Sequence, residues 1–221
     1  MPKWVKFLIA VLLLPICLGT AIALSRVFSH SGNMREIWLP MLAGAACWIV
    51  VFILLPKPMW VYVVGHELTH AVWTWIFGGK VKKFKASSEG GHVITTKSNF
   101  VIALAPYFFP LYAVFVVIIF MIGSLIWYWK PYLVWFHLLL GAAYAFHVTL
   151  TWHILKTRQS DITGQGYLFS GVVIFLGNAA VLLIGIPLVA THGDKLTALG
   201  HAFSEWFNAN HHVLHRVANL F

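Results

Sequence analysis

The chain has 221 residues, of which 60% are apolar and only 10% are charged. Soluble globular domains carry about a quarter charged residues and disordered chains are poor in apolar ones, so this composition excludes both classes. The formal net charge is +9, but the basic residues lie between apolar runs, which argues against nucleic acid as a partner. An integral, multi-pass membrane protein remains, whose flanking lysines and arginines meet the headgroups of the lipid bilayer.

Six apolar runs are long enough to cross a bilayer, which takes about 20 residues. Charges, glycines or prolines bound these runs, which lie at about 7–28, 37–55, 59–77, 100–129, 132–155 and 167–190. The first run follows Lys3 and Lys6 and contains Ala21-Ile22-Ala23, so a cleaved signal peptide is the alternative to a retained span. Because the run continues to Phe28, beyond an ordinary signal core, we favour the span.

The remaining segments predict a short β hairpin and an amphipathic helix. Lys80–Asn99 is the longest polar segment, and its alternating pattern followed by β-branched residues indicates a hairpin at the membrane surface. Pro106 and Pro110 predict a kink or a break in the fourth run. Apolar residues at helical spacing over 195–220 are typical of an amphipathic helix lying on the membrane. The predicted fold is therefore a single all-α polytopic domain, residues 1–221, with this hairpin and tail helix.

One of the six acidic residues, Glu67, falls in the middle of the third apolar run. Inserting an acidic side chain into a membrane costs about 3 kcal/mol, so its presence indicates a functional site. His66-Glu67-Leu68-Thr69-His70 is the H-E-x-x-H pattern. Residues four apart share a helix face, so both imidazoles can bind one zinc ion while Glu67 acts as general base and acid on a water that zinc activates. The alternatives are a buried polar cluster with a protonated Glu67, and a proton relay.

The pattern and its surroundings resemble the site-2-protease family of intramembrane zinc metallopeptidases. That family carries small residues near the motif, as Gly65 and Ala71 are here, and later a glycine pair with a β-structured membrane loop, to which Gly78-Gly79 and Gly90-Gly91 are similar. Leu104-Ala105-Pro106 is similar to a further motif, and the resemblance covers about residues 59–170. It implies a zinc endopeptidase that hydrolyses a peptide bond in or near a transmembrane segment of a membrane protein substrate.

The resemblance also implies a third zinc ligand, an aspartate from a later span that commonly stands in a Leu-Asp-Gly context. This sequence offers Ser160-Asp161-Ile162 instead, between the fifth and sixth runs, and Asp161 takes that role by elimination and by its order in the chain. Asp161 could otherwise cap the next helix or pair with Arg158. Glu89 is the competitor, because 18 residues separate it from His70 as in soluble zinc peptidases with a glutamate ligand. Those enzymes place the glutamate on a helix, and the residues around Glu89 are poor helix formers.

The departure from Leu-Asp-Gly supports a second hypothesis, a catalytically inactive membrane metalloprotein that acts as a scaffold or substrate-binding pseudoprotease. A metal or proton carrier should have polar residues in several spans, and here they concentrate in one. His147, on the fifth run, is either a hydrogen-bonded packing residue or a partner of a zinc-ligand carboxylate or of substrate. The Lys80–Asn99 hairpin could hold an unwound substrate strand by edge pairing.

Overall fold

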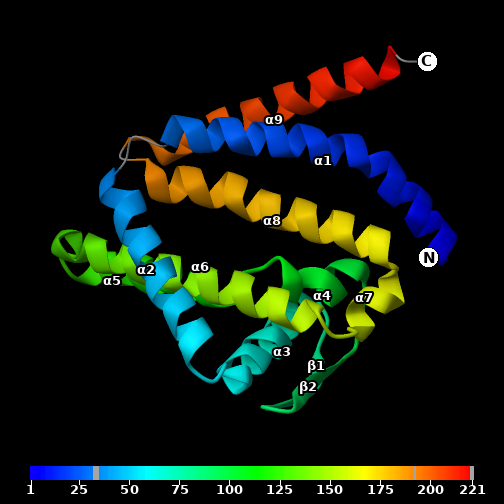
Figure 1. The fold of residues 1–221 in the computed structure, drawn as a ribbon, viewed down its shortest axis with the longest axis horizontal. Helices are drawn as coiled ribbons and strands as arrows, with labels where there is room; N and C mark the ends of the chain where they lie inside the picture. The colour runs from blue at the N-terminus through cyan, green and yellow to red at the C-terminus, as the bar shows by residue number, and fades with distance from the viewer. Residues whose placement is uncertain (32–34, 192, 220–221) are drawn as a thin grey trace. The chain divides into compact units, whose positions relative to one another are not determined.

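The computed structural model of the protein describes residues 1–31, 35–191 and 193–219 (Figure 1). The chain divides into two compact units, one made of Met1–Met34 and Ser160–Phe221 and the other of Arg35–Gln159. The first unit contains the helices α1 (Lys3–Ser31), α7 (Ser160–Gln165), α8 (Tyr167–Ala190) and α9 (Lys195–Ala218). The second contains α2 (Arg35–Leu54), α3 (Met59–Ile76), β1 (Val81–Ser87), β2 (Gly90–Thr95), α4 (Phe100–Leu104), η1 (Ala105–Tyr107), α5 (Leu111–Ile126), η2 (Lys130–Tyr132) and α6 (Leu133–Leu155).

Four described helices are long and apolar enough to cross a membrane, namely α1, α2, α8 and the stretch Lys130–Leu155 that contains α6. A fifth candidate exists if α5 and the preceding Phe100–Tyr107 form one span, because these two parts are bent by 81°. The prediction of six spans is therefore wrong in number. α3 fills the third predicted run but is not among the described helices that pass this test, because its 18 residues carry two histidines, a glutamate and two threonines. Burial of Glu67, Thr69 and Thr74 inside the protein accommodates this polarity.

The fourth predicted run is broken where its prolines stand, as predicted. α4 ends at Leu104, the short 3₁₀ turn η1 contains Pro106, and α5 begins directly after Pro110. Proline is tolerated near the start of a helix because the N–H that it lacks has no partner there. The break therefore separates two helices instead of bending one.

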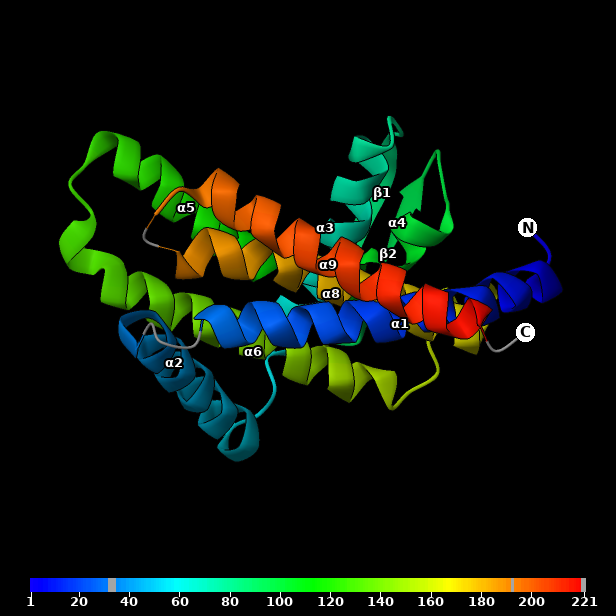
Figure 2. The same ribbon diagram turned by 90° about the horizontal axis from the view of Figure 1, so that it is seen from above.

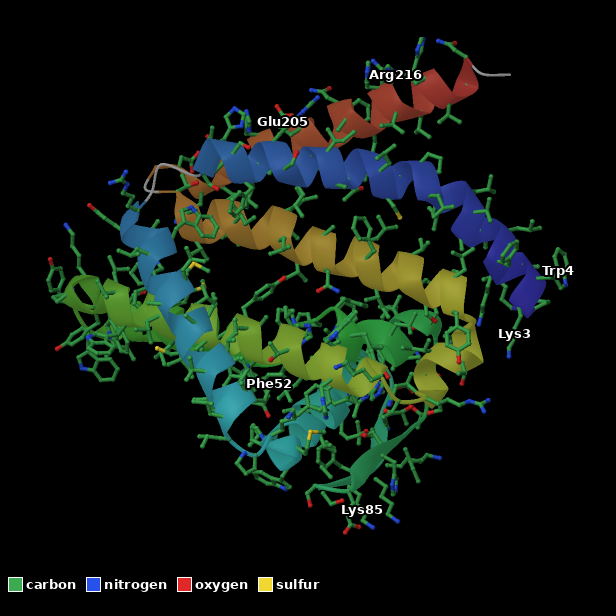
Figure 3. All side chains as sticks on the ribbon, in the orientation of Figure 1. Lys3, Trp4, Phe52, Lys85, Glu205 and Arg216 are labelled. Atoms are coloured by element: carbon green, nitrogen blue, oxygen red, sulfur yellow. The ribbon has the colours of Figure 1, made fainter. Side chains whose placement is uncertain are left out.

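The segment after α3 forms the predicted hairpin, an antiparallel pair of β1 and β2. Ser87 pairs with Gly90, which leaves Ser88 and Glu89 as a two-residue turn, and the Ser87 hydroxyl donates a hydrogen bond to the Gly90 carbonyl at 2.7 Å. Gly90 has a φ of +143°, a conformation that side chains disfavour. The lysines of β1 are exposed, among them Lys85, which is labelled beside the hairpin in Figure 3.

Helices α2 and α6 approach each other closely because each has a glycine at the contact. A Cβ atom added at Gly44 would lie 1.9 Å from the carbonyl oxygen of Leu138, and one added at Gly141 would lie 2.0 Å from that of Met41. Small residues let the backbones of two helices come this near, which is a common way for apolar helices to associate in membranes.

We expect Gly44→Ala to destabilise the protein by about 1–3 kcal/mol, because the added methyl group must push the backbone of α6 away. Thermal unfolding in detergent, followed by circular dichroism, measures the effect. Gly185→Ala on α8 is the matched control, since a Cβ there meets nothing within 4 Å and alanine is the better helix former. Equal stability of Gly44→Ala and wild type would contradict the close packing of α2 on α6.

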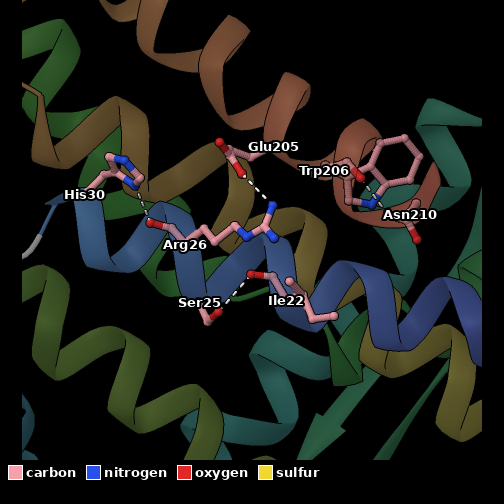
Figure 4. Close-up of polar contacts among 7 residues, drawn as sticks. All are labelled: Ile22, Ser25, Arg26, His30, Glu205, Trp206 and Asn210. Atoms are coloured by element: carbon pink, nitrogen blue, oxygen red, sulfur yellow. Dashed lines mark hydrogen bonds and ion pairs between the residues drawn. The ribbon is translucent and has the colours of Figure 1, made fainter. Parts of the chain in front are cut away.

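In the other unit, α1, α8 and α9 run side by side (Figures 1 and 2). Arg26 of α1 pairs with Glu205 of α9 at 3.3 Å, and the Trp206 indole N–H donates to the Thr20 hydroxyl at 3.0 Å (Figure 4 shows the ion pair). The predicted tail helix is thus a helix, and it buries Ala202, Ala209, Asn210 and Val213. It ends at Ala218; Leu220, in the predicted range, lies outside the described residues. Its position on the membrane surface stays a prediction.

Asp194 caps the start of α9. The hydroxyl of Thr197 and the backbone N–H groups of Leu196 and Thr197 donate hydrogen bonds to its carboxylate and hold its pKa below the ordinary value of 3.8. The cap therefore contributes stability above that pH and loses it as the pH falls through the lowered pKa.

Candidate metal centre

Helix α3 presents the H-E-x-x-H residues on one side of a regular α-helix. The rings of His66 and His70 lie 5.0 Å apart between centroids and are half-buried, and the Glu67 side chain between them in sequence is buried. The helix stops at the glycine pair as predicted: Gly78 has a φ of +69°, and the N–H groups of Gly78 and Gly79 donate to carbonyls of the last turn at 2.8 Å. Two imidazoles at this separation can offer nitrogen atoms to one metal ion.

The His70 ring is held by a backbone carbonyl. Its Nδ1 lies 2.8 Å from the oxygen of Ile102, which only accepts, so Nδ1 donates the hydrogen bond. Metal-binding histidines commonly donate their second ring N–H in this way, which fixes the tautomer and the orientation of the ring. A neutral His70 held in this orientation can offer Nε2 to a metal ion.

The Ile102 carbonyl is positioned in turn by Asn99. The Asn99 side chain caps α4, accepting a hydrogen bond from the N–H of Ile102 at 2.8 Å. A cap of this kind contributes about 1 kcal/mol to helix stability. Asn99 thus helps to orient the His70 ring indirectly, because it fixes the residue whose carbonyl accepts the hydrogen bond from His70.

We expect Asn99→Ala to weaken metal binding by up to about tenfold without abolishing it, because loss of the cap loosens the carbonyl that orients His70. Zinc titration against a competing chelator measures the change. Asn99→Asp keeps an acceptor oxygen at the cap and should bind zinc like wild type. Weakening of the same size in both variants would show that the cap is not the cause.

His66 is packed between aromatic rings from two directions. The ring of Tyr62, one turn earlier on α3, lies 5.8 Å from it, and the buried Tyr107 ring of η1 meets it edge to face at 5.4 Å. The break in the fourth run therefore places Tyr107 of η1 against the H-E-x-x-H motif.

The small residue next to the motif, Gly65, is explained by the close packing of Tyr112 against it. A Cβ atom there would lie 2.6 Å from the ring of Tyr112, whose hydroxyl donates to the Val61 carbonyl at 2.5 Å. Glycine lets α5 rest directly on α3. The sequence marked Gly65 only through the resemblance, and Tyr112 carried no signal of its own.

The hairpin lies against Glu67. A Cβ atom at Gly91 of β2 would come within 2.7 Å of Glu67 Cγ and 2.9 Å of its Oε1. Strand β2 thus covers the glutamate with backbone, since any larger residue at position 91 would collide with it. Sequence reasoning placed Gly91 in the hairpin but could not show this contact, because it links residues 24 positions apart.

The three predicted zinc ligands come from two elements of the chain. The two histidines belong to α3, and Asp161 lies half-buried in the first turn of α7, in the other unit of the chain. Two imidazoles and one carboxylate are a donor set that suits zinc and leaves a fourth position for water. Glu89, the competing candidate, is exposed in the hairpin turn.

The site thus consists of a helical histidine pair, a glutamate covered by a strand and a carbonyl that orients one histidine. These features are local to α3 and the elements packed on it. Comparison of the chain with protein families, with curated proteins and with solved structures finds no match.

Proposed function

We propose that the protein is an intramembrane zinc metalloendopeptidase, which hydrolyses a peptide bond in or near a transmembrane segment of a membrane protein substrate. The observation that carries the proposal is the H-E-x-x-H helix α3, with Glu67 buried and His70 oriented by the Ile102 carbonyl. The chain around it supplies at least four helices long and apolar enough to cross a membrane. Such a protein is an integral, multi-pass membrane protein.

His66, His70 and Asp161 would hold the zinc ion. The imidazoles bind as neutral ligands and the carboxylate lowers the charge of the site, which is the usual donor pattern of catalytic zinc. Zinc, when bound, supplies a Lewis acid that polarises a carbonyl group and lowers the pKa of water. The proposal assigns the third ligand to Asp161 because the family resemblance implies an aspartate from a later span, whereas Glu89 is exposed in the hairpin turn.

Glu67 would be the catalytic acid and base. Its carboxylate takes the proton of the attacking water, and the carboxylic acid so formed passes that proton to the amine leaving the broken peptide bond. Only a few per cent of Glu67 is exposed, and β2 covers it at Gly91. Exclusion of bulk water strengthens the interactions of the carboxylate with the reacting groups.

The hairpin would hold the substrate. A helical segment has its carbonyls bonded internally, so it must unwind before water can attack one of them. β1 and β2 form a sheet of two strands, and an unwound segment can add to such a sheet as a further strand. The contact of Gly91 with Glu67 would bring that strand near the catalytic group.

A second candidate function is a catalytically inactive metalloprotein that binds membrane segments as a scaffold or pseudoprotease. It is favoured by the sequence around Asp161, which follows Ser160 and precedes Ile162 instead of standing in the Leu-Asp-Gly context. The two functions share the metal site and differ in whether Glu67-dependent cleavage occurs.

The test is the zinc content of detergent-purified wild type beside Asp161→Ala, Glu89→Ala and Glu67→Gln, by elemental analysis of the same preparations. We expect near-stoichiometric zinc in all but Asp161→Ala. A folded wild type without zinc would overturn the proposal, and full zinc in Asp161→Ala would remove Asp161 from the site. Zinc in wild type without any cleavage of co-reconstituted single-span membrane proteins would favour the inactive scaffold.

A further inference from the structure

A small cavity lies beside His66. Its volume is about 20 Å³, and its lining includes Gly65, His66, Thr69, Pro106, Tyr112 and His147. A cavity of about 10–15 Å³ on this measure accommodates one water molecule. The space therefore suits a single oxygen atom next to a proposed zinc ligand.

Two of the polar side chains around this cavity already have hydrogen-bond partners. The Thr69 hydroxyl donates to the Gly65 carbonyl at 2.7 Å, and the Tyr112 hydroxyl donates to the Val61 carbonyl at 2.5 Å. Neither hydroxyl has a proton left for a ligand, because each carries only one.

His147, on α6, is different. Its side chain is buried, with 8% exposed, and its Nε2 has no hydrogen-bond partner among the residues that the structure describes. Buried polar atoms are paired in the large majority of cases, and a neutral imidazole can donate from Nε2 in one of its two tautomers. A buried donor that lines a cavity of this size indicates an oxygen ligand there.

We propose that His147 binds the carbonyl oxygen of the peptide bond to be cleaved, donating a hydrogen bond from Nε2, and that a water takes this place when no substrate is bound. The inference rests on the proposed function. Negative charge develops on that oxygen when water adds to the carbonyl carbon, so a fixed donor stabilises the transition state. The proton of the attacking water still passes to Glu67 and then to the leaving amine. His147 neither gains nor loses a proton overall.

Acetohydroxamate is the probe, because its carbonyl and hydroxamate oxygens both bind zinc and imitate the substrate carbonyl and the attacking water. Isothermal titration of zinc-loaded wild type should show binding, and His147→Leu should bind it roughly 10–100-fold more weakly, as expected for loss of a hydrogen bond to a charged oxygen. His147→Gln keeps a side-chain N–H donor and should recover part of the affinity. Zinc content should be the same in all three.

His137→Leu is the matched control, since His137 is also buried on α6 but does not line the cavity. It should bind acetohydroxamate like wild type. Undiminished binding by zinc-loaded His147→Leu would overturn the inference while leaving the peptidase proposal intact. Loss of zinc from both His147 variants would overturn it as well, by giving His147 a structural role. A wild type that binds neither zinc nor acetohydroxamate would instead remove the proposed function itself.

Discussion

Glu67→Gln is expected to reduce peptide cleavage by about 10²–10⁴-fold while leaving the zinc content unchanged. Glutamine has nearly the shape of glutamate but cannot take up a proton from water and return it to an amine. The variant should fold, because its amide fits beside Gly91 where the carboxylate lies. Cleavage of a reconstituted single-span substrate, followed over time by gel electrophoresis, gives the rate, and elemental analysis gives the zinc.

Glu89→Gln provides the control for this experiment. It makes the same chemical change at an exposed position in the hairpin turn, so cleavage should continue at the wild-type rate. Wild-type activity in Glu67→Gln would exclude Glu67 as the acid and base, and equal losses in the two glutamine variants would indicate a general effect of charge.

His70→Ala is expected to remove zinc and cleavage together. The substitution deletes one of the proposed ligands, so its effect on zinc affinity should exceed the roughly 10–100-fold loss that outer partners of ligands cause. It should therefore be far larger than the effect of Asn99→Ala, which acts only through the Ile102 carbonyl. Titration with zinc in the presence of a competing chelator covers this range of affinities.

His92→Ala is a suitable control, because His92 is exposed on β2 and is not one of the proposed zinc ligands. It should keep zinc at wild-type affinity. Stoichiometric zinc at wild-type affinity in His70→Ala would contradict the assignment of His70 and leave the buried polar cluster as the better interpretation of the motif.

Local patterns predicted much of the molecule. The H-E-x-x-H spacing, the glycine pair after it and the β-branched run that follows each depend on neighbouring residues, and α3 and the β1–β2 hairpin lie where these patterns indicate. Pro106 and Pro110 interrupt the helix where they stand, whatever packs around them, so the break between α4 and α5 was equally predictable. The boundaries of α3 differ from the predicted 59–77 by one residue.

Features that depend on distant partners were not predictable. Counting apolar runs gave six spans, and one of them was α3. The length of a run does not show that the polar side chains of α3 are buried against other elements of the protein. The partner of His70 is a backbone carbonyl, which every residue carries, so no residue type could point to Ile102. The approach of Tyr112 to Gly65 likewise depends on how α5 packs on α3.

Because residue 91 is glycine, strand β2 approaches Glu67 at this position with backbone and no side chain. A strand without a side chain at that point cannot distinguish one substrate side chain from another, and backbone hydrogen bonds are the same for every residue except proline. Under the proposed function, the place of cleavage would then be set by how readily a membrane segment unwinds. Glycines and other weak helix formers in the substrate, instead of a fixed sequence motif, would decide where the chain is cut.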